Sequence, residues 1–216
     1  METLTDLRQH HFDLLKEIGN IGAGHSATAL SRLLNKKISM NVPHARLVSF
    51  NELVELFGGP EEEVACVFLR IEGEFHGSFF FIMAVSQAEI FISTLLEKQG
   101  ICLSDDQNKE FYASVFQELG NILTGSYLTA MGDLTGRVFM PSVPAISIDM
   151  FGAVIIQGLV NAAVDEDHAI LIDTKIMEET ETGGKVIEGH FFLVPDPESF
   201  SLLFQLAGVK DENRKY

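Results

Sequence analysis

Two pairs of an acidic residue and an amide residue recur in this chain with the same spacing. Asn20 follows Glu17 by three residues, and Asn121 follows Glu118 by three residues, 101 positions further along. An asparagine side chain carries both a carbonyl acceptor and an amide donor, so it can hold and aim a water molecule, and a fixed carboxylate can pair with a lysine of a partner. Each pair could therefore orient a water for attack on a labile bond of another molecule, and orientation alone lowers such a barrier substantially.

Other kinds of chemistry have no support in the residue pattern. No serine–histidine–aspartate or cysteine–histidine set has a recognisable spacing, and the seven histidines show neither the H-x3-H nor the HExxH spacing of a metal site. Cys66 and Cys102 form neither a disulfide framework nor a zinc site. We therefore predict no metal or cofactor on this chain, and two free thiols in a reducing cytoplasm.

The first pair lies in a long helical pattern, which we predict over Asp6–Leu34. At 100° per residue, Asp13, Glu17 and Asn20 lie within about 60° of one another and form one polar stripe, whereas the apolar residues of the segment face the core. Gly24 continues the stripe one turn later. A glycine costs a helix about 1 kcal/mol, but it lets another surface come close to the backbone.

The second pair lies in a matching pattern, which predicts a helix over Asp105–Leu134. Ser114, Glu118 and Asn121 occupy the same angles as the first stripe, and Gly125 follows one turn later. Asparagine is a mediocre helix former. Its return at the same position, with the same glutamate before it, therefore favours a function over a merely solvated helix face.

The two stripes belong to a longer internal repeat. Residues 13–43 and residues 114–144 are identical at ten of 31 positions when they are aligned at an offset of 101. We interpret this as one duplication and predict two copies, about residues 6–100 and 104–210, that share a core within a single domain of residues 1–216.

Each copy has the same predicted order of elements after its long helix. A short extended segment leads to a proline, a second helix follows, and two strands joined by a short loop precede a closing helix; such strands pair antiparallel. The expected class is therefore α+β, with two pseudo-symmetric halves that each contain a long helix, a shorter helix and antiparallel strands. The predicted bounds are Phe50–Phe57 and Asp149–Val160 for the second helices, Val64–Ile71, Gly77–Met83, His168–Ile176 and Val186–Val194 for the strands, and Gln87–Glu97 and Pro197–Leu206 for the closing helices.

The chain carries 31 acidic and 15 basic side chains, a formal net charge of −16. Such a chain is a poor ligand for nucleic acid or anionic lipid, and it suits a partner with exposed lysine or arginine. The longest apolar stretch without a charge, residues 150–164, is shorter than the roughly 18–20 residues of a membrane span, and the N-terminus has no secretory signal. We therefore predict a cytoplasmic protein without membrane insertion.

The full motif around each pair resembles the signature of the CheC/CheX/FliY family, whose members are phosphatases of the chemotaxis response regulator CheY. The signature has the form [Asp/Ser]-x3-Glu-x2-Asn-x22-Pro. Both copies in this chain are complete, and they read Asp13-x3-Glu17-x2-Asn20-x22-Pro43 and Ser114-x3-Glu118-x2-Asn121-x22-Pro144.

The resemblance implies a fold in which both long helices lie on one side of an antiparallel sheet, and an enzyme that hydrolyses the aspartyl phosphate of CheY. It implies that Asn20 and Asn121 place the attacking water and that Glu17 and Glu118 pair with the active-site lysine of the receiver domain. The receiver itself would carry the Mg²⁺. The resemblance implies supporting roles for the remaining motif residues, which are Asp13, Pro43, Ser114 and Pro144.

The resemblance also implies a second partner, the receptor deamidase CheD, for which we expect a contact near Asp149–Ile155. One alternative remains open, a non-catalytic binding module that sequesters phosphorylated CheY or CheD. A structural component of the flagellar switch is less favoured. Such relatives carry a further C-terminal domain, and this chain ends soon after its second copy.

Overall fold

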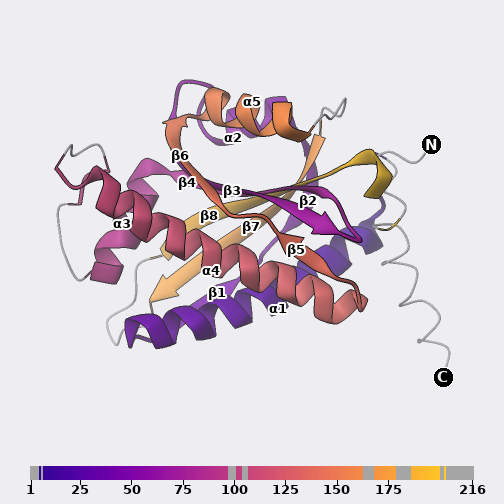
Figure 1. The fold of residues 1–216 in the computed structure, drawn as a ribbon, viewed down its shortest axis with the longest axis horizontal. Coiled ribbons are helices and arrows are strands. Elements are labelled where there is room, and N and C mark those ends of the chain that lie inside the picture. The colour runs from indigo at the N-terminus through magenta and orange to yellow at the C-terminus, as the bar shows by residue number, and fades with distance from the viewer. Residues whose placement is uncertain are drawn as a thin grey trace.

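The computed structural model of the protein describes residues 5, 7–96, 101–103, 107–162, 168–178, 186–199 and 202. Within them, helices cover both faces of an eight-stranded sheet whose paired strands run antiparallel. The long helices α1 (Gln9–Leu34) and α4 (Lys109–Thr135) lie side by side on one face, and the shorter α2 (Phe50–Leu56) and α5 (Phe151–Ala162) lie on the other (Figure 1). This arrangement confirms the expected α+β class.

The remaining elements follow the same order in the two halves of the chain. In the first half α1 is followed by two strands, α2, two strands and a helix, and in the second half α4 is followed by two strands, α5 and two strands. Their bounds are Ile38–Asn41 (β1), Ala45–Ser49 (β2), Glu63–Gly73 (β3), Gly77–Ala84 (β4) and Val85–Leu96 (α3) in the first half, and Phe139–Pro141 (β5), Ala145–Met150 (β6), His168–Glu178 (β7), Val186–Pro195 (β8) and Pro197–Ser199 (η2, a 3₁₀ helix) in the second.

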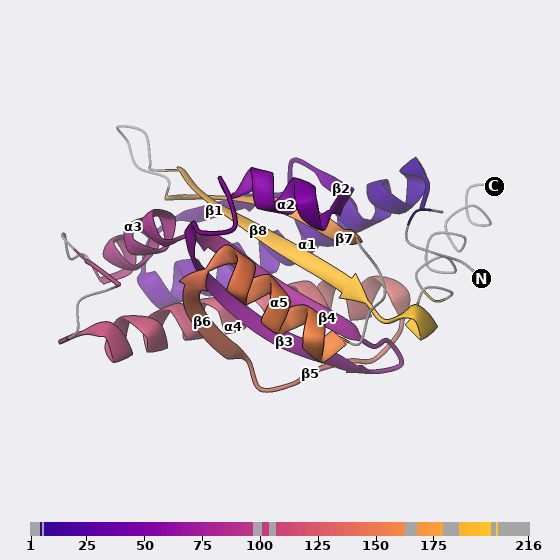
Figure 2. The same ribbon diagram turned by 90° about the horizontal axis from the view of Figure 1, so that it is seen from above.

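Strands from the two halves are interleaved in the sheet. The order is β1–β7–β8–β4–β3–β5, with β2 also paired to β7 and β6 also paired to β3. Figure 2 shows the sheet from the side of α2 and α5, with β8 and β4 side by side near its middle. Each half therefore supplies strands whose backbone hydrogen bonds are completed by the other half.

The sheet is buried on both faces, because successive side chains of a strand point to opposite sides. In β4, Phe79 and Phe81 belong to the core layer under α1 and α4, whereas Phe80 and Ile82 belong to the layer under α2 and α5. This two-sided burial explains why the strand is a continuous apolar run without polar alternation.

Two glycines set how closely the long helices approach each other and the sheet. A Cβ at Gly22 would lie 2.9 Å from the Cα of Tyr127, so the backbones of α1 and α4 touch there. A Cβ at Gly120 would lie 2.3 Å from Cγ2 of Val67, so α4 rests directly on β3. A residue with a side chain would hold these surfaces further apart.

The structure differs from the sequence-based expectation after each proline. The strands β2 and β6 form there, before the second helix, whereas the sequence assigned no element between each proline and that helix. Asp149 therefore lies in β6, and α5 begins at Phe151. Both strands pair with segments far along the chain, so no local turn signal marks them.

Some predicted helix bounds are also corrected. The helix α1 begins at Gln9 and not at Asp6, and the described part of α4 begins at Lys109, with Asp105 outside the described residues. Of the predicted closing helix Pro197–Leu206, the first three residues form the 3₁₀ helix η2, and residues 200, 201 and 203–206 lie outside the described residues.

The start of α1 depends on a neutral histidine. The backbone N–H of Arg8, the residue before the helix, donates to Nδ1 of His11 at 2.9 Å. His11 is 5% exposed. Burial, together with the nearby His10, lowers the pKa of its imidazole below the ordinary 6.5. Since a protonated Nδ1 cannot accept a hydrogen bond, protonation would both break this cap and charge a buried group.

We therefore expect the free energy of unfolding to fall as the pH is lowered through 6.5, because the unfolded chain then binds a proton that the folded chain does not. The loss should level off below the lowered pKa of His11. Urea unfolding of wild type and His11→Asn at pH 7.5 and 5.5 measures it, and the advantage of wild type should shrink at the lower pH. His25→Asn, at an exposed position of the same helix, is the control. An equal advantage of wild type over His11→Asn at both pH values would contradict this role of His11.

Candidate functional site

The polar stripes of α1 and α4 are both exposed to solvent. Glu17 and Asn20 are exposed on α1, and Glu118 and Asn121 are exposed on α4. The two helices lie side by side over the same face of the sheet (Figure 1). The structure thus brings the four predicted residues to one side of the molecule, as two stripes on separate helices.

The first stripe lines a shallow depression. Its volume is about 430 Å³, and it is lined by Asp13, Lys16, Glu17, Asn20 and Ile21. All five residues come from about two turns of one helix, so helical geometry alone places them together. Lys16 brings a positive charge beside two carboxylates, and Ile21 adds an apolar edge.

Asn20 is held in one orientation by the turn that carries Pro43. The backbone N–H of Val42 donates to Oδ1 of Asn20 at 2.9 Å, and Val42 itself is 2% exposed. The interval of 22 residues between Asn20 and Pro43 thus has a physical meaning, because it returns the chain to the asparagine. Pro43 has a restricted φ, which stiffens this turn.

This hydrogen bond decides which part of the Asn20 amide is available. The carbonyl oxygen already has one protein partner, whereas the two N–H donors of Nδ2 make no hydrogen bond to the described residues and can face a ligand on the exposed side. The sequence predicted a water held by both ends of the amide. In the structure the amide end is the better placed of the two, and the oxygen can contribute only its second lone pair.

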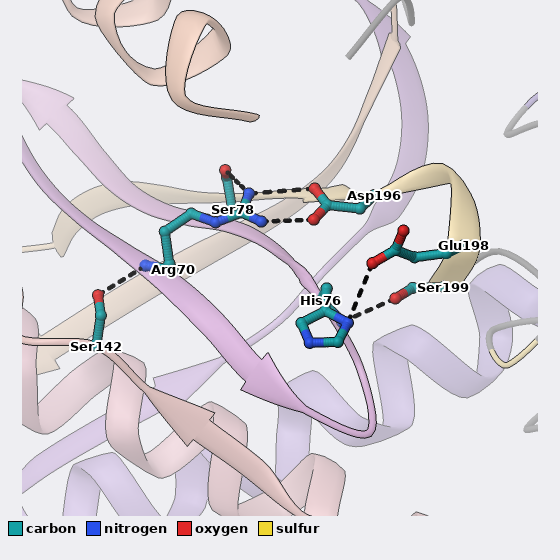
Figure 3. Close-up of polar contacts among 7 residues, drawn as sticks. All are labelled: Arg70, His76, Ser78, Ser142, Asp196, Glu198 and Ser199. Carbon is teal, nitrogen blue, oxygen red and sulfur yellow. Dashed lines mark hydrogen bonds and ion pairs between the residues drawn. The ribbon is translucent and has the colours of Figure 1, made fainter. Parts of the chain in front are cut away.

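The corresponding turn of the second motif is held differently. Nε2 of Gln117 donates to the carbonyl of Pro144 at 2.8 Å. Oγ of Ser142 accepts from the backbone N–H of Arg70 at 3.0 Å, and the N–H of Ser142 donates to the Arg70 carbonyl at 2.8 Å. Figure 3 shows Ser142 beside Arg70, whose guanidinium donates to both carboxylate oxygens of Asp196. The turn is therefore fixed to β3.

The difference between the two turns follows from the space under each helix. A Cβ at Gly19 of α1 would lie 3.1 Å from Cγ2 of Val42, so the valine side chain fills the space beneath that helix. A Cβ at Gly120 of α4 would lie 2.3 Å from a methyl group of Val67, which leaves no equivalent space. Val143, the counterpart of Val42, is accordingly 88% exposed.

Asn121 has no counterpart of the Val42 hydrogen bond. Within the described part of the chain, its side chain makes no hydrogen bond, so both its carbonyl and its amide are available to a ligand. The two motifs therefore share their residue types but differ in how rigidly the asparagine is held.

Asp13 and Ser114, which open the two motifs, contact their own helices. Oδ1 of Asp13 accepts from Nε2 of Gln9 at 3.0 Å, and Oγ of Ser114 donates to the carbonyl of Glu110 at 2.8 Å. Both residues lie on the predicted stripes. These contacts are local to the first turns of each helix, four residues before the motif residue concerned.

Gly24 and Gly125 continue the stripes and have open space beside them. A Cβ at either glycine meets no atom of the described residues within 4 Å. In both helices the glycine carbonyl accepts from a threonine hydroxyl four residues later, from Thr28 at 2.9 Å and from Thr129 at 2.8 Å. The missing side chains therefore matter to a molecule that approaches each helix from outside.

We expect Gly24→Ala and Gly125→Ala each to raise the free energy of unfolding by about 0.5–1 kcal/mol, because alanine is the better helix former. The sequence predicts a protein partner for the stripes, and the same variants should bind that partner less tightly, because a methyl group would stand where it is expected to approach the backbone. Denaturant unfolding measures the first effect, and a binding titration measures the second. Stabilised variants with an unchanged affinity would show that these glycines serve no contact.

Three further properties bear on what the site can do. The described residues contain no group of three or more His, Cys, Asp or Glu side chains that could hold a metal ion. No disulfide joins Cys66 and Cys102; Cys66 is buried, which raises the pKa of its thiol, and Cys102 is exposed. None of the helices in the described ranges is long and apolar enough to cross a membrane.

Two residues that shape the sites carry no chemical signal in the sequence. Val42 acts on Asn20 through its backbone N–H, and Val143 stands exposed beside the second motif. Their one signal is that the residue before the motif proline is a valine in both copies.

The fold and the stripes together define a class of protein, an α+β domain that presents the same acid–amide motif twice on one side. Residues 11–45 and 103–148, which contain both motifs up to their prolines, match the CheC-like family. The CheY-P phosphatase CheC of Bacillus subtilis (strain 168) is 47% identical over 209 residues, which make up 97% of this chain and 99% of that protein. This chain belongs to the CheC-like family.

One further relative and one solved structure are also similar to this chain. The flagellar motor switch phosphatase FliY of Bacillus subtilis (strain 168) is 32% identical over 143 residues, which are 66% of this chain and 37% of FliY. The crystal structure of Thermotoga maritima FliY matches with a TM-score of 0.75 at 19% identity, over 95% of this chain and 99% of that one. At that identity the match shows a common fold.

Proposed function

We propose that this protein hydrolyses the aspartyl phosphate of the response regulator CheY, and that each of its two stripes is an active site. The observation that carries the proposal is the conformation of Asn20, an exposed amide held rigidly on a helix beside Glu17 and an open depression. The 47% sequence identity with the CheY-P phosphatase CheC of Bacillus subtilis, which extends over 97% of this chain, supports the same reaction.

In the proposed reaction the receiver domain supplies the phosphoryl group and the Mg²⁺, and this chain supplies the side chains that orient the attacking water. The amide of Asn20 or Asn121 holds a water in line with the bond between phosphorus and the aspartyl oxygen. The water oxygen bonds to phosphorus, the bond between phosphorus and the aspartyl oxygen breaks with its electron pair left on the aspartate carboxylate, and the two protons of the water leave with the inorganic phosphate. A water that is already held in line does not have to reach the phosphorus by random collision, and this positioning can account for much of the rate enhancement.

Glu17 and Glu118 are the docking residues of this proposal. Each carboxylate pairs with the active-site lysine of the receiver and sets the register in which the two proteins meet. A neutral amide suits the position next to the carboxylate, because a second negative charge there would repel the phosphoryl group. The net charge of −16 favours the approach of a partner that presents lysine.

The decay of phosphorylated CheY separates a phosphatase from a binding module. With this protein at a small fraction of the CheY concentration, a phosphatase empties the whole phosphorylated pool, because each molecule turns over many times. A sequestering module can affect only as many CheY molecules as there are binding sites on the added protein. Decay that is unchanged by a substoichiometric amount of this protein would overturn the proposal in favour of the binding module.

The proposal includes an origin by internal duplication, with one domain over residues 1–216. The register of the sheet supports it: β1 places Met40 opposite Ile176, and β5 places Pro141 opposite Ile71. Shifts of 101 and 105 residues relate these two pairs. The same shifts relate the pairing of β2 with β7 to the pairing of β6 with β3. A copied segment leaves such constant offsets.

CheD stays a predicted second partner. The expected contact region, Asp149–Ile155, comprises the end of β6 and the beginning of α5. Because α5 lies on the opposite face of the sheet from α1 and α4, this region leaves the stripes open for a second protein.

A further inference from the structure

The second stripe is flanked by exposed apolar side chains at two positions where the first stripe has none. Phe111 is 55% exposed and Val143 is 88% exposed. At the aligned positions, 101 residues earlier, the first copy has the exposed His10 and the buried Val42. Single apolar side chains on a surface are common. These two stand out because they flank the same motif.

Phe111 belongs to the face of α4 that carries the motif. At 100° per residue it lies about 20° from Glu118 and two turns before it on the helix surface. Its ring packs against the ring of Tyr112, with centroids 5.8 Å apart, and Tyr112 is buried. An aromatic ring supported in this way offers a large apolar area at a low cost in conformational entropy.

Val143 is held in place although its own side chain is in solvent. The residue before it, Ser142, makes two hydrogen bonds to the backbone of Arg70, and the carbonyl of Pro144 after it accepts from Gln117. Gln117 directly precedes Glu118, so this turn lies beside the second motif. A partner that covers Val143 therefore has little backbone motion to restrict.

We propose that Phe111 and Val143 form the apolar part of a docking surface that exists at the second stripe and not at the first, and that its occupant is the phosphorylated receiver domain. This inference rests on the proposed function and deepens it. Glu118 sets the register of docking, and the apolar pair supplies affinity, as a few anchor residues do at many interfaces. The receiver accordingly binds the second stripe more tightly than the first.

Variants with one asparagine left separate the two stripes kinetically. Asn20→Ala leaves the second stripe and Asn121→Ala leaves the first, and we expect the lower KM for the former. Adding both Phe111→Ser and Val143→Ser to Asn20→Ala should raise its KM about tenfold, with kcat little changed. His10→Phe, added to Asn121→Ala, should lower the KM of the first stripe, because it supplies the missing aromatic side chain.

Ile156→Ser is the matched control, since it removes an exposed apolar side chain from α5 on the opposite face of the sheet. If Ile156→Ser raised the KM as much as the Phe111→Ser and Val143→Ser substitutions do, the proposal would be overturned. Sedimentation equilibrium tests the other occupant, a second copy of this chain. A dimer that the Phe111 and Val143 substitutions abolish, with KM unchanged, would likewise overturn it.

A direct binding measurement keeps this inference separable from the reaction itself. A receiver domain loaded with beryllofluoride imitates the phosphorylated state, so its Kd can be measured in the absence of turnover. Weaker binding after Phe111→Ser and Val143→Ser would support the docking surface even if no hydrolysis were found, which would refute only the proposed reaction. A Kd that these substitutions leave unchanged would refute the docking surface.

Discussion

Replacing both Asn20 and Asn121 with alanine is expected to return the decay of phosphorylated CheY to its intrinsic rate. In the proposed mechanism the double variant still docks, because it keeps Glu17 and Glu118, but it no longer places a water at either stripe. Misplacing a reacting group by about 1 Å costs on the order of 100-fold in rate. We therefore expect kcat to fall by at least about 100-fold, with little change in KM.

Each single variant should keep the activity of the other stripe, and the release of inorganic phosphate from CheY measures all three. We expect each single variant to lose the part of the phosphatase activity that its own stripe contributes. The double variant should lose the activity of both stripes. A double variant that hydrolyses as fast as wild type would contradict the assignment of both asparagines.

Asn20→Asp is the matched variant that separates chemistry from folding. Asn20→Ala leaves the N–H of the buried Val42 without its acceptor, which costs about 1–3 kcal/mol of stability. An aspartate still offers an oxygen to Val42 but places a negative charge beside the phosphoryl group. The first stripe should thus lose activity while the fold keeps its stability. Asn121→Ala should cost little stability, because its side chain makes no hydrogen bond with the described residues.

Gly120→Ala is expected to lower the free energy of unfolding by about 3 kcal/mol, the upper end of the usual range for overpacking. The added Cβ would lie 2.3 Å from Cγ2 and 2.7 Å from Cβ of Val67, which is fully buried. Val67 lies in β3, which is paired to β4 on one side and to β6 on the other. Neither the strand nor α4 can move aside without losing other contacts.

Gly125→Ala provides the matched control on the same helix, because the Cβ there meets no atom of the described residues. The two substitutions make the same chemical change about 1.4 turns apart, and we expect changes of opposite sign in the free energy of unfolding by urea. Combining Gly120→Ala with Val67→Ala should recover part of the loss, since the second change removes the methyl groups in the way. A Gly120→Ala variant as stable as wild type would show that α4 does not rest on β3.

The stripes could be predicted from the sequence because they are a property of single helices. Asp13, Glu17 and Asn20 are separated by four and three residues, and this spacing alone puts them on one face of any helix that contains them. The α+β class followed in the same way from local apolar patterns, and the structure confirms it.

The strands β2 and β6 could not be predicted in this way, because their stability comes from partners far along the chain. In β6, Ile148 lies opposite Ala65 of β3, and in β2, Leu47 lies opposite Ile170 of β7. A short half-exposed segment becomes a strand only when such a partner is beside it. The sequence pattern around Asp149 accordingly favoured a helix, where the structure has the end of a strand.

By itself, the sequence determined which residues stand together on each helix, and its complete motifs determined the family resemblance, because helical spacing and residue type are local properties. Only the tertiary structure decided how the two motifs differ. Val42 is buried and holds Asn20, whereas Val143 is exposed and leaves Asn121 unheld within the described residues. The reason is the contact of Gly120 with Val67, which seats α4 so close to β3 that the second valine has no place beneath its helix.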